Sequence, residues 1–210
     1  MVQHKYFINL DKDTDRAEYF KQTDFIRWRA TPKEEVSDEV DKKMISYYNY
    51  PKSSHLGRCG CFESHIKLLE HIVKNKLNDV LICEDDARQV GDIPTTYPTD
   101  SLLYVGGFFH KKKITDNSKV IIHSTDGIND LPKDHRILMT MSYIIPTWQL
   151  AQQILKKIKS LHRYRAIDIL YGNIDVNTRY LYPAVFEETG TPSTIHKKTK
   201  RANRYYEWIK

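Results

Sequence analysis

The stretch HLGRCGCFESHIKLLEHIVKNKLNDVLICEDDA, from His55 to Ala87, predicts the central unit of the fold. In its first part apolar side chains recur at helical period, which indicates an amphipathic helix with one face toward a core. Gly57 and Gly60 indicate the turn that opens this helix, and Asn75 to Asp79 its end. Asp79 to Cys83 has the composition of a buried strand, so the stretch predicts a helix-to-strand unit of an α/β sheet. The predicted apolar helix face consists of Cys61, Phe62, His65, Leu68, Leu69, Ile72 and Val73.

Three carboxylates, Glu84, Asp85 and Asp86, directly follow the buried strand. Aspartate is common where a strand turns into a loop, so a plain turn is one explanation. The other is a site for a positive group, because ligands of open α/β sheets bind beyond the carboxyl ends of the strands. Oxygen ligands suit Mg²⁺ and Mn²⁺, and a cation held by one or two carboxylates keeps positions open for substrate phosphates. The location at a strand end favours the site over the turn.

Further helices and strands alternate along the rest of the chain. Arg16 to Ile26 has helical spacing, and Thr31 to Tyr50 predicts a loop with a short helix. A strand from Ser101 to Val105 is expected to stop at the pair Gly106-Gly107. The other predicted elements are strands at Lys5 to Leu10, Lys119 to His123, Ile137 to Ile145 and Arg179 to Phe186, a helix capped by Thr147, and a short helix at Asp168 to Tyr171.

Length and composition predict a globular protein without a membrane span. The 210 residues are 40% hydrophobic and 29% charged, as is usual for globular domains. No apolar run approaches the ~20 residues that cross a bilayer, and the N-terminus lacks the form of a signal peptide. We therefore predict one α/β domain over residues 1–195, in the cytoplasm. The spacing of Cys59, Cys61 and Cys83 fits no usual zinc motif, which predicts buried, reduced thiols.

The net charge of +6 is unevenly distributed. Residues 196–210, HKKTKRANRYYEWIK, form a strongly basic C-terminal tail, and His110 to Lys113 is a second basic run. A basic surface attracts anions, which include nucleic acid, an anionic membrane and phosphate-bearing small substrates. Ordinary solvated surface is the alternative for both runs.

Four segments, in order, resemble glycosyltransferase family 25, which contains lipopolysaccharide and collagen galactosyltransferases. INLDKDTDR (Ile8 to Arg16) is similar to the family's opening strand, and GRCGCFESHIKLL (Gly57 to Leu69) to its Gly-Cys-x-x-Ser-His helix. VLICEDDA (Val80 to Ala87) is similar to its apolar strand with Glu-Asp-Asp. SYIIPTWQLAQQIL and AIDILYGN are similar to its later strand, helix and aspartate. The resemblance covers about residues 5–195, and the Gly-Cys-x-x-Ser-His helix followed by the acidic strand end is its most specific part.

The resemblance implies a GT-A fold, a Rossmann-like α/β domain with a single mixed β-sheet flanked by helices. It also implies inverting transfer of a hexose, galactose or glucose, from a UDP-sugar to a glycan, a lipid-linked sugar or a protein hydroxyl. Mn²⁺ or Mg²⁺ would be held by Glu84 and Asp86, with His196 as a further ligand. The catalytic candidates are Asp168, as the base that takes the acceptor proton, and His65. The donor-binding candidates are Asn9, Leu10, Asp11, Arg16, Ser64, Glu84 and Asp85.

Most of these candidates have a purely structural alternative. His65 lies on an apolar helix face, where a lone histidine is usually part of the core. Asp168 is also placed to act as a helix N-cap. Asn9 and Asp11 follow a strand and would suit a plain turn. His196 belongs to the basic tail, which would contact either an anionic membrane or the acceptor.

Two other functions are compatible with the composition. A nucleic-acid-binding or metal-dependent nuclease domain would explain the positive charge, but not the Asn-Leu-Asp or Gly-Cys-x-x-Ser-His segments, so nucleic acid is not the favoured partner. A catalytically inactive GT-A domain that only binds glycan is the second alternative. The intact acidic triplet argues against it.

Overall fold

The computed structural model describes residues 1–45, 51–111, 124–189 and 207–208. Its strands are β1 His4–Asn9, β2 Ile26–Arg29, β3 Val80–Glu84, β4 Ala87–Gln89, β5 Leu102–Lys111, β6 Gly127–Asp130, β7 His135–Ile145, β8 Thr178–Tyr182, β9 Phe186–Glu188 and β10 Glu207–Trp208. Its helices are α1 Thr14–Ala17, α2 Asp38–Lys43, α3 Lys52–Asn75, α4 Trp148–Lys159 and α5 Ile167–Tyr171, with the short 3₁₀ helices η1 Tyr19–Gln22 and η2 Lys33–Glu35.

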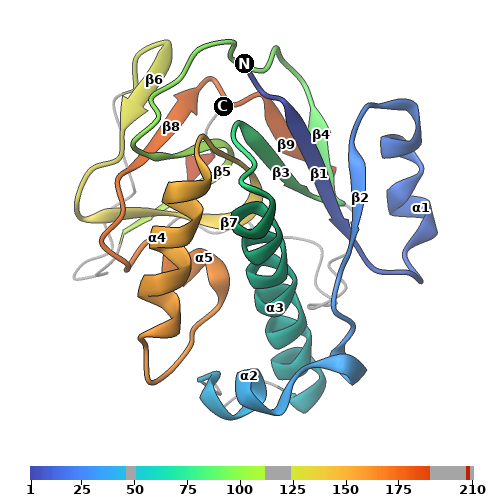
Figure 1. Cartoon of the computed structure of the whole chain (residues 1–210). Helices are drawn as coiled ribbons and strands as arrows, with labels where there is room; N and C mark the ends of the chain where they lie inside the picture. Colours follow the sequence, from blue (N-terminus) through green and yellow to red (C-terminus); the bar gives the residue numbers. More distant parts are fainter. Residues whose placement is uncertain (46–50, 112–123, 190–206, 209–210) are drawn as a thin grey trace.

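The main sheet is mixed and follows the order β2-β1-β3-β7-β5-β8-β6, with β10 paired to β5. β1, β2 and β3 are parallel, whereas β7 runs antiparallel between β3 and β5. Helices flank this sheet (Figure 1), so the expected Rossmann-like α/β architecture is confirmed. Beside the main sheet, β4 and β9 form a separate two-stranded ribbon. No helix in the described ranges is long and apolar enough to cross a membrane.

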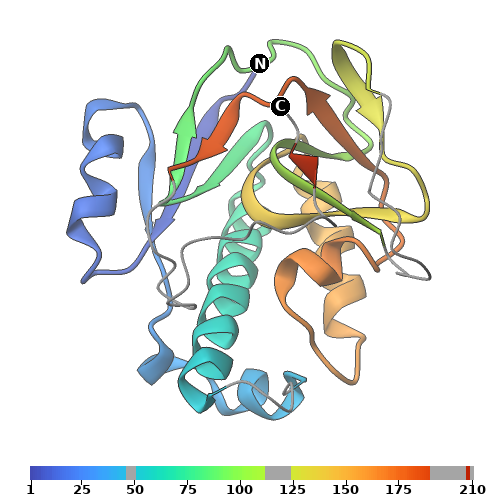
Figure 2. The same cartoon turned by 180° about the vertical axis from the view of Figure 1, so that it is seen from behind.

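The central strand β3 is covered on both faces, and its side chains alternate between two cores. Val80 and Ile82 pack with apolar residues of α3, α4 and α5. Leu81 and Cys83 pack with Phe20 and with the β4–β9 ribbon on the opposite face, which Figure 2 shows from behind. Burial of both faces explains why the strand is continuously apolar instead of alternating.

Several predicted elements are confirmed. The strands predicted at Lys5 to Leu10, Asp79 to Cys83 and Ile137 to Ile145 correspond to β1, β3 and β7. The Thr147 hydroxyl accepts a hydrogen bond from the Leu150 N–H at 3.2 Å, so Thr147 caps α4 as predicted.

The helix predicted over Arg16 to Ile26 is wrong, because α1 ends at Ala17 and β2 begins at Ile26. β2 pairs with β1, and this long-range pairing overrides the local helical spacing. The turn predicted at Gly57 and Gly60 is also wrong, since α3 already begins at Lys52.

Gly60 is needed instead for close packing. A Cβ atom there would lie 2.5 Å from the carbonyl oxygen of Thr31, so only glycine lets the loop after β2 lie this close to α3.

The pair Gly106-Gly107 does not end its strand, because β5 runs on to Lys111. The pairing of β5 with β7 is irregular on both sides of Gly106, and Gly107 has φ +132°, so the glycines allow bulges within the strand. The single strand predicted over Arg179 to Phe186 is divided between β8 and β9. The strand predicted at Lys119 to His123 lies outside the described residues. Within the basic tail, the backbone of Glu207–Trp208 pairs with β5.

The cap of α4 gives a test of the fold. Thr147→Ala should destabilise the protein by about 1 kcal/mol, because the Leu150 N–H loses its acceptor. For a chain of this size that lowers the melting temperature by about 2–4 °C. Thr147→Ser keeps the hydroxyl and should melt close to the wild type. Equal melting temperatures for the alanine and serine variants in a thermal scan would contradict the capping role.

Candidate functional site

The acidic triplet lies where the carboxyl ends of three parallel strands meet. β1 and β3 are in register with Ile8 opposite Glu84, so Asn9 follows beside Asp85. β2 adds Arg29 opposite Asn9. Open α/β sheets bind their ligands at this edge. The sheet therefore brings together two of the segments that resemble the family, Ile8 to Arg16 and Val80 to Ala87.

Asp85 connects β1 and α1 to the end of β3. Its two carboxylate oxygens accept hydrogen bonds from the Asn9 amide at 2.8 Å and from the Arg16 guanidinium at 2.7 Å. Arg16 and Asp85 are both largely buried. Burial raises the pKa of Asp85, and the bonds from Arg16 and Asn9 oppose this rise. Both oxygens of Asp85 are therefore already engaged within the protein.

Asp86 is buried without comparable compensation. Its Oδ1 atom has no hydrogen-bond partner among the described residues, and Arg16 lies 3.6 Å from Oδ2. Burial, followed by the charges of Glu84 and Asp85, raises the pKa of Asp86 to about 7. A divalent cation would offset these unfavourable contributions. Asp86 therefore fits the predicted role of metal ligand.

Glu84 is held by residues from β7 and α3. The Thr140 hydroxyl donates to its Oε1 atom, and the His65 Nε2 atom lies 3.6 Å from the same oxygen. Burial alone would raise the pKa of Glu84, but His65, Thr140 and Arg16 together hold the pKa below its ordinary value. Glu84 is thus an oriented, ionised carboxylate beside Asp86. The contacts from Thr140 and His65 are of the kind that orients a metal-binding carboxylate.

His65 is completely buried behind Glu84. Its Nδ1 atom lies 2.7 Å from the Tyr143 hydroxyl, which is 3.3 Å from the Tyr171 hydroxyl. The thiol of Cys61 also lies near, since ligand atoms of Cys61, His65 and Glu84 are all within 4.8 Å of one another. This placement suits a residue that positions Glu84 better than one that touches an acceptor.

Asp168 lies in the first turn of α5, where it is half-buried. The N-cap is Ala166, so the structural alternative that Asp168 caps this helix is wrong. Its carboxylate instead accepts N–H groups from Met139 at 3.2 Å and Ile169 at 2.7 Å. Met139 has φ +62°, an unusual conformation for a non-glycine residue that presents its N–H to Asp168. Burial raises the pKa of Asp168, which moves it toward the range useful to a general base.

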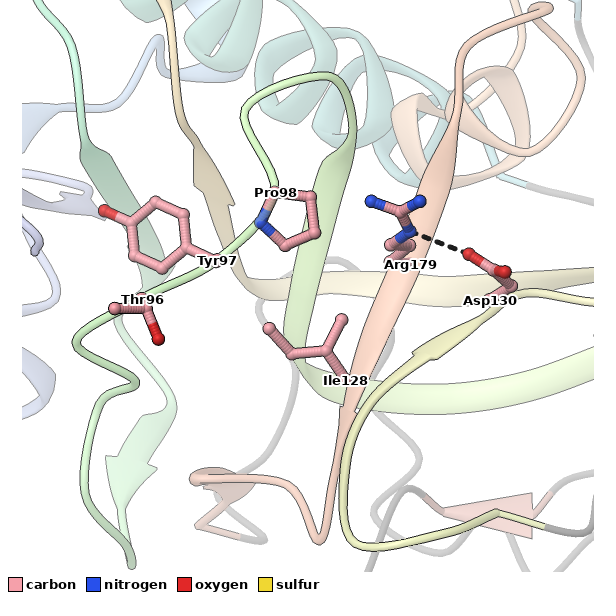
Figure 3. A pocket seen from close by; sticks show the side chains of 6 residues that line it. All are labelled: Thr96, Tyr97, Pro98, Ile128, Asp130 and Arg179. Atoms are coloured by element: carbon pink, nitrogen blue, oxygen red, sulfur yellow. Dashed lines mark hydrogen bonds and ion pairs between the residues drawn. The ribbon is translucent and has the colours of Figure 1, made fainter.

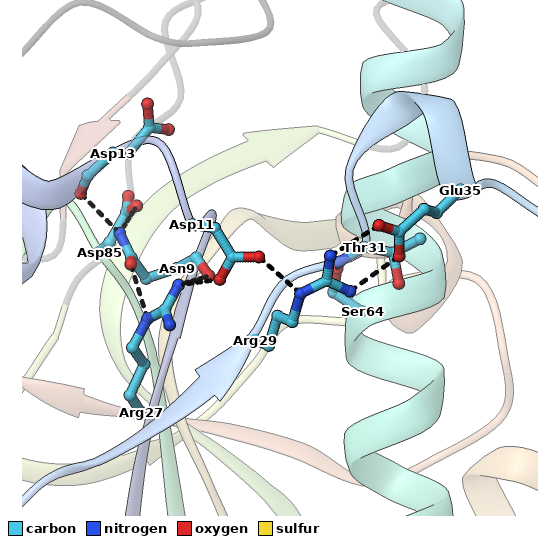
Figure 4. Close-up of polar contacts among 9 residues, drawn as sticks. All are labelled: Asn9, Asp11, Asp13, Arg27, Arg29, Thr31, Glu35, Ser64 and Asp85. Atoms are coloured by element: carbon cyan, nitrogen blue, oxygen red, sulfur yellow. Dashed lines mark hydrogen bonds and ion pairs between the residues drawn. The ribbon is translucent and has the colours of Figure 1, made fainter.

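A chain of hydrogen bonds and ion pairs links Asn9 to the arginines of β2 (Figure 4). Arg27 donates to the Asn9 side chain at 2.9 Å and to Asp11 at 2.7 Å. Arg29 also donates to Asp11, at 2.6 Å, and binds both carboxylate oxygens of Glu35. These pairs lower the pKa of Asp11. The predicted donor residues Asn9 and Asp11 are therefore brought together, with two arginines that were not predicted.

Ser64 and Leu10 lie differently from the other donor candidates. Ser64 is buried, donates to the Gly60 carbonyl at 2.6 Å and accepts the Thr31 N–H at 2.8 Å (Figure 4). It therefore joins α3 to the loop after β2. Leu10 is partly buried and packs against the core on the α3 side of the sheet. His196 and residues 190–206 lie outside the described residues.

Several contacts of the candidate site were not predicted from the sequence. Arg27 was missed because β2 was assigned to a helix, where its register with Asn9 cannot be seen. Thr140 and Tyr171 were missed because their role depends on pairing between β3 and β7 and on the placement of α5. The only sequence signal for them is their membership of the later matching segment and its neighbourhood.

A pocket of about 560 Å³ lies elsewhere, where β5 and β8 begin. Arg179 lines it and donates a hydrogen bond to Asp130 at 2.7 Å (Figure 3). A second bond, to Asp100, measures 3.1 Å. Tyr97, also in its lining, bonds Asp79 just before β3. The pocket is thus at the amino ends of these strands, opposite the acidic triplet. We assign the site to the triplet.

Comparison with known protein families identifies the family of the chain. The profile of glycosyltransferase family 25, described as LPS biosynthesis protein, matches residues 2–171. This range includes the ends of β1 and β3, all of α3 and the whole of α5. None of the curated proteins is a match. Because the profile covers most of the chain, the protein belongs to glycosyltransferase family 25.

Proposed function

We propose that this glycosyltransferase is metal-dependent, and that it transfers a hexose from a UDP-sugar with inversion. The observation that carries the proposal is the buried Asp86 carboxylate, which has an oxygen without a partner in the described structure beside the oriented Glu84. UDP, galactose or glucose, and inversion are inferred from the family resemblance. The family description supports a glycan or lipid-linked sugar of the LPS type as the acceptor.

Glu84 and Asp86 would hold Mn²⁺ or Mg²⁺, since both supply hard oxygen ligands. When bound, the cation neutralises charge on the leaving nucleoside diphosphate. Asp85 contributes through Arg16 and Asn9, because its ion pair keeps the strand end in place while Asp86 stays available. Thr140 and His65 hold Glu84 in one orientation.

Asp168 is the proposed general base. It is half-buried, belongs to a different element from the metal ligands, and has a raised pKa. Its bonds from the Met139 and Ile169 N–H groups keep the carboxylate in one orientation. In this role it removes the acceptor proton as the hydroxyl attacks the anomeric carbon from the face opposite the diphosphate.

The donor nucleoside is assigned to the edge formed by β1 and β2. Asn9 and Asp11 are fixed there by Arg27, and Arg29 adds a second exposed guanidinium. Exposed charged groups next to a metal site suit a nucleotide, which is anionic and rich in hydrogen-bonding groups. A glycan-binding domain without activity would keep this edge but would not need Asp168.

Asp86→Asn tests the metal site. The variant should lose Mn²⁺-dependent stabilisation by UDP in a thermal-shift assay, because an amide is a poor ligand for a hard cation. In metal-free buffer at pH 8 it should melt above the wild type. Because folding raises the pKa of Asp86 to about 7, folded-state stability falls as the pH rises from the ordinary aspartate pKa of ~4 to about 7, and the full penalty is present at pH 8.

The exposed Asp92, just after β4, supplies the control. Asp92→Asn should respond to Mn²⁺ and UDP as the wild type does. Retention of a normal Mn²⁺-dependent UDP response by folded Asp86→Asn protein would rule out Asp86 as a metal ligand.

Asp168→Asn tests the base. Asparagine keeps one oxygen for the Ile169 N–H but loses the acceptor for the Met139 N–H, so the variant should stay folded with a moderately lower melting temperature. The chemical step should slow by roughly 10²–10⁴-fold, because an amide cannot take the acceptor proton. The donor KM should stay near that of the wild type, which places the loss in kcat.

Asp175→Asn, at an exposed position after α5, is the matched control and should leave kcat unchanged. A stable Asp168→Asn enzyme with nearly full kcat would show that another residue accepts the proton.

A further inference from the structure

A second group of potential metal ligands lies away from the acidic triplet, between α2 and the first turns of α3. Asp41 belongs to α2, and His55 and Cys59 lie one turn apart on α3. Ligand atoms of these three residues lie within 4.8 Å of one another. Cys59 is fully buried, His55 is 12% exposed in its side chain and Asp41 is 45% exposed, so the group is open to solvent on one side.

The Asp41 carboxylate and the Cys59 thiol both approach the same ring nitrogen of His55. The Nε2 atom of His55 lies 2.9 Å from Asp41 Oδ1 and 3.6 Å from Cys59 Sγ. A ring nitrogen carries at most one proton, so Nε2 cannot serve both as donor to the carboxylate and as acceptor from the thiol. A cation at the centre would satisfy all three atoms together.

The spacing also fits a small tetrahedral cation. Usual zinc–ligand bond lengths place a nitrogen and an oxygen about 3.4 Å apart, and a nitrogen and a sulfur about 3.6 Å apart. The Nε2–Sγ distance already equals the second value, and the Nε2–Oδ1 distance needs to open by only about 0.5 Å. Small movement of the exposed Asp41 side chain is enough for this.

The position of α2 is fixed independently of these three residues. The Ser37 N–H, at the start of α2, donates to Glu63 on α3 at 3.0 Å. At the other end, Met44 forms a β-bridge with Tyr164, and the Ile45 N–H donates to the Tyr164 carbonyl at 2.8 Å. Asp41 is therefore presented to His55 by a segment that is anchored on both sides.

We propose that Asp41, His55 and Cys59 form a binding site for a borderline divalent transition metal, with zinc as the best fit. Thiolate and imidazole ligands select zinc over Mg²⁺ and Mn²⁺, which prefer oxygen. Three protein ligands leave a fourth position for water on the exposed side. The site differs in ligand chemistry from Glu84 and Asp86, and it does not depend on the function proposed for them.

The affinity of this site should be moderate. The Nδ1 atom of His55 is buried and has no hydrogen-bond partner in the described part of the chain. Metal-bound histidines usually donate from their second nitrogen, and losing that bond weakens binding by about 10–100-fold. Bound metal would join α2 to the first turns of α3.

Cobalt titration of the full-length, chelator-stripped protein tests the proposal, because thiolate ligation gives Co²⁺ an intense near-ultraviolet charge-transfer band. The wild type should bind one equivalent with this band. Cys59→Ser and His55→Asn should each lose it and bind at least 100-fold more weakly. Cys61→Ser, two positions along the same helix and near Glu84, is the matched control and should keep the band.

Absence of the band in the wild type, its survival in Cys59→Ser, or its loss only in Cys61→Ser would each overturn the proposal. Zinc at a hundredfold excess over its Kd should also raise the melting temperature of the wild type by roughly 5–10 °C. This rise should persist in Asp86→Asn and disappear in His55→Asn. A rise that is lost in Asp86→Asn alone would assign the zinc to the acidic triplet instead.

Discussion

The ion pair between Asp85 and Arg16 is the interaction on which the site depends. It joins residues 69 positions apart, and the bond from Asn9 to the same carboxylate spans 76 positions. Removing one partner of a buried pair leaves an uncompensated charge, which typically costs 3–5 kcal/mol. Arg16 also lies 3.6 Å from Asp86, so a single guanidinium faces two carboxylates. The proposed cation at the end of β3 would offset this local excess of negative charge.

The Glu84 carboxylate is oriented by side chains from several rigid elements. Thr140 comes from β7, His65 from α3, and the hydroxyls of Tyr143 and Tyr171 extend the contact into the core. Each of these side chains is at least nine-tenths buried, so little freedom remains for Glu84 to lose when a ligand binds. Asp86 shows the opposite arrangement. Burying its carboxylate with one oxygen unpartnered among the described residues lowers the stability of the folded protein, but leaves that oxygen available. Such compromises are characteristic of functional sites.

The strand β3 and the helix α4 could be predicted because burial leaves a clear pattern of apolar side chains in the sequence. β3 is continuously apolar, and α4 combines a strict helical period with the Thr147 cap. β2 was missed because its alternation of apolar side chains with arginine covers only four residues, too few to outweigh the helical spacing before it, and its structure depends on pairing with β1. The same limit applies to the site. The triplet is contiguous in sequence, but the partners of Asp85 and Glu84 come from distant segments and depend on register. Gly60 was assigned to a turn for a related reason, because its close contact with Thr31 exists only once α3 packs against that loop.

The position of β2 has a consequence for solubility. β2 is the outermost strand on its side of the sheet, so one row of its backbone N–H and C=O groups has no neighbouring strand within the described fold. Open edges of this kind invite pairing between molecules, and charged side chains on a short strand are a common defence. Arg27 and Arg29 are 40% and 50% exposed, and they flank Trp28 on this four-residue strand. The arginines at the proposed donor edge therefore also discourage edge-to-edge aggregation, so replacing either one would be expected to change both the proposed nucleotide contacts and the colloidal stability of the protein.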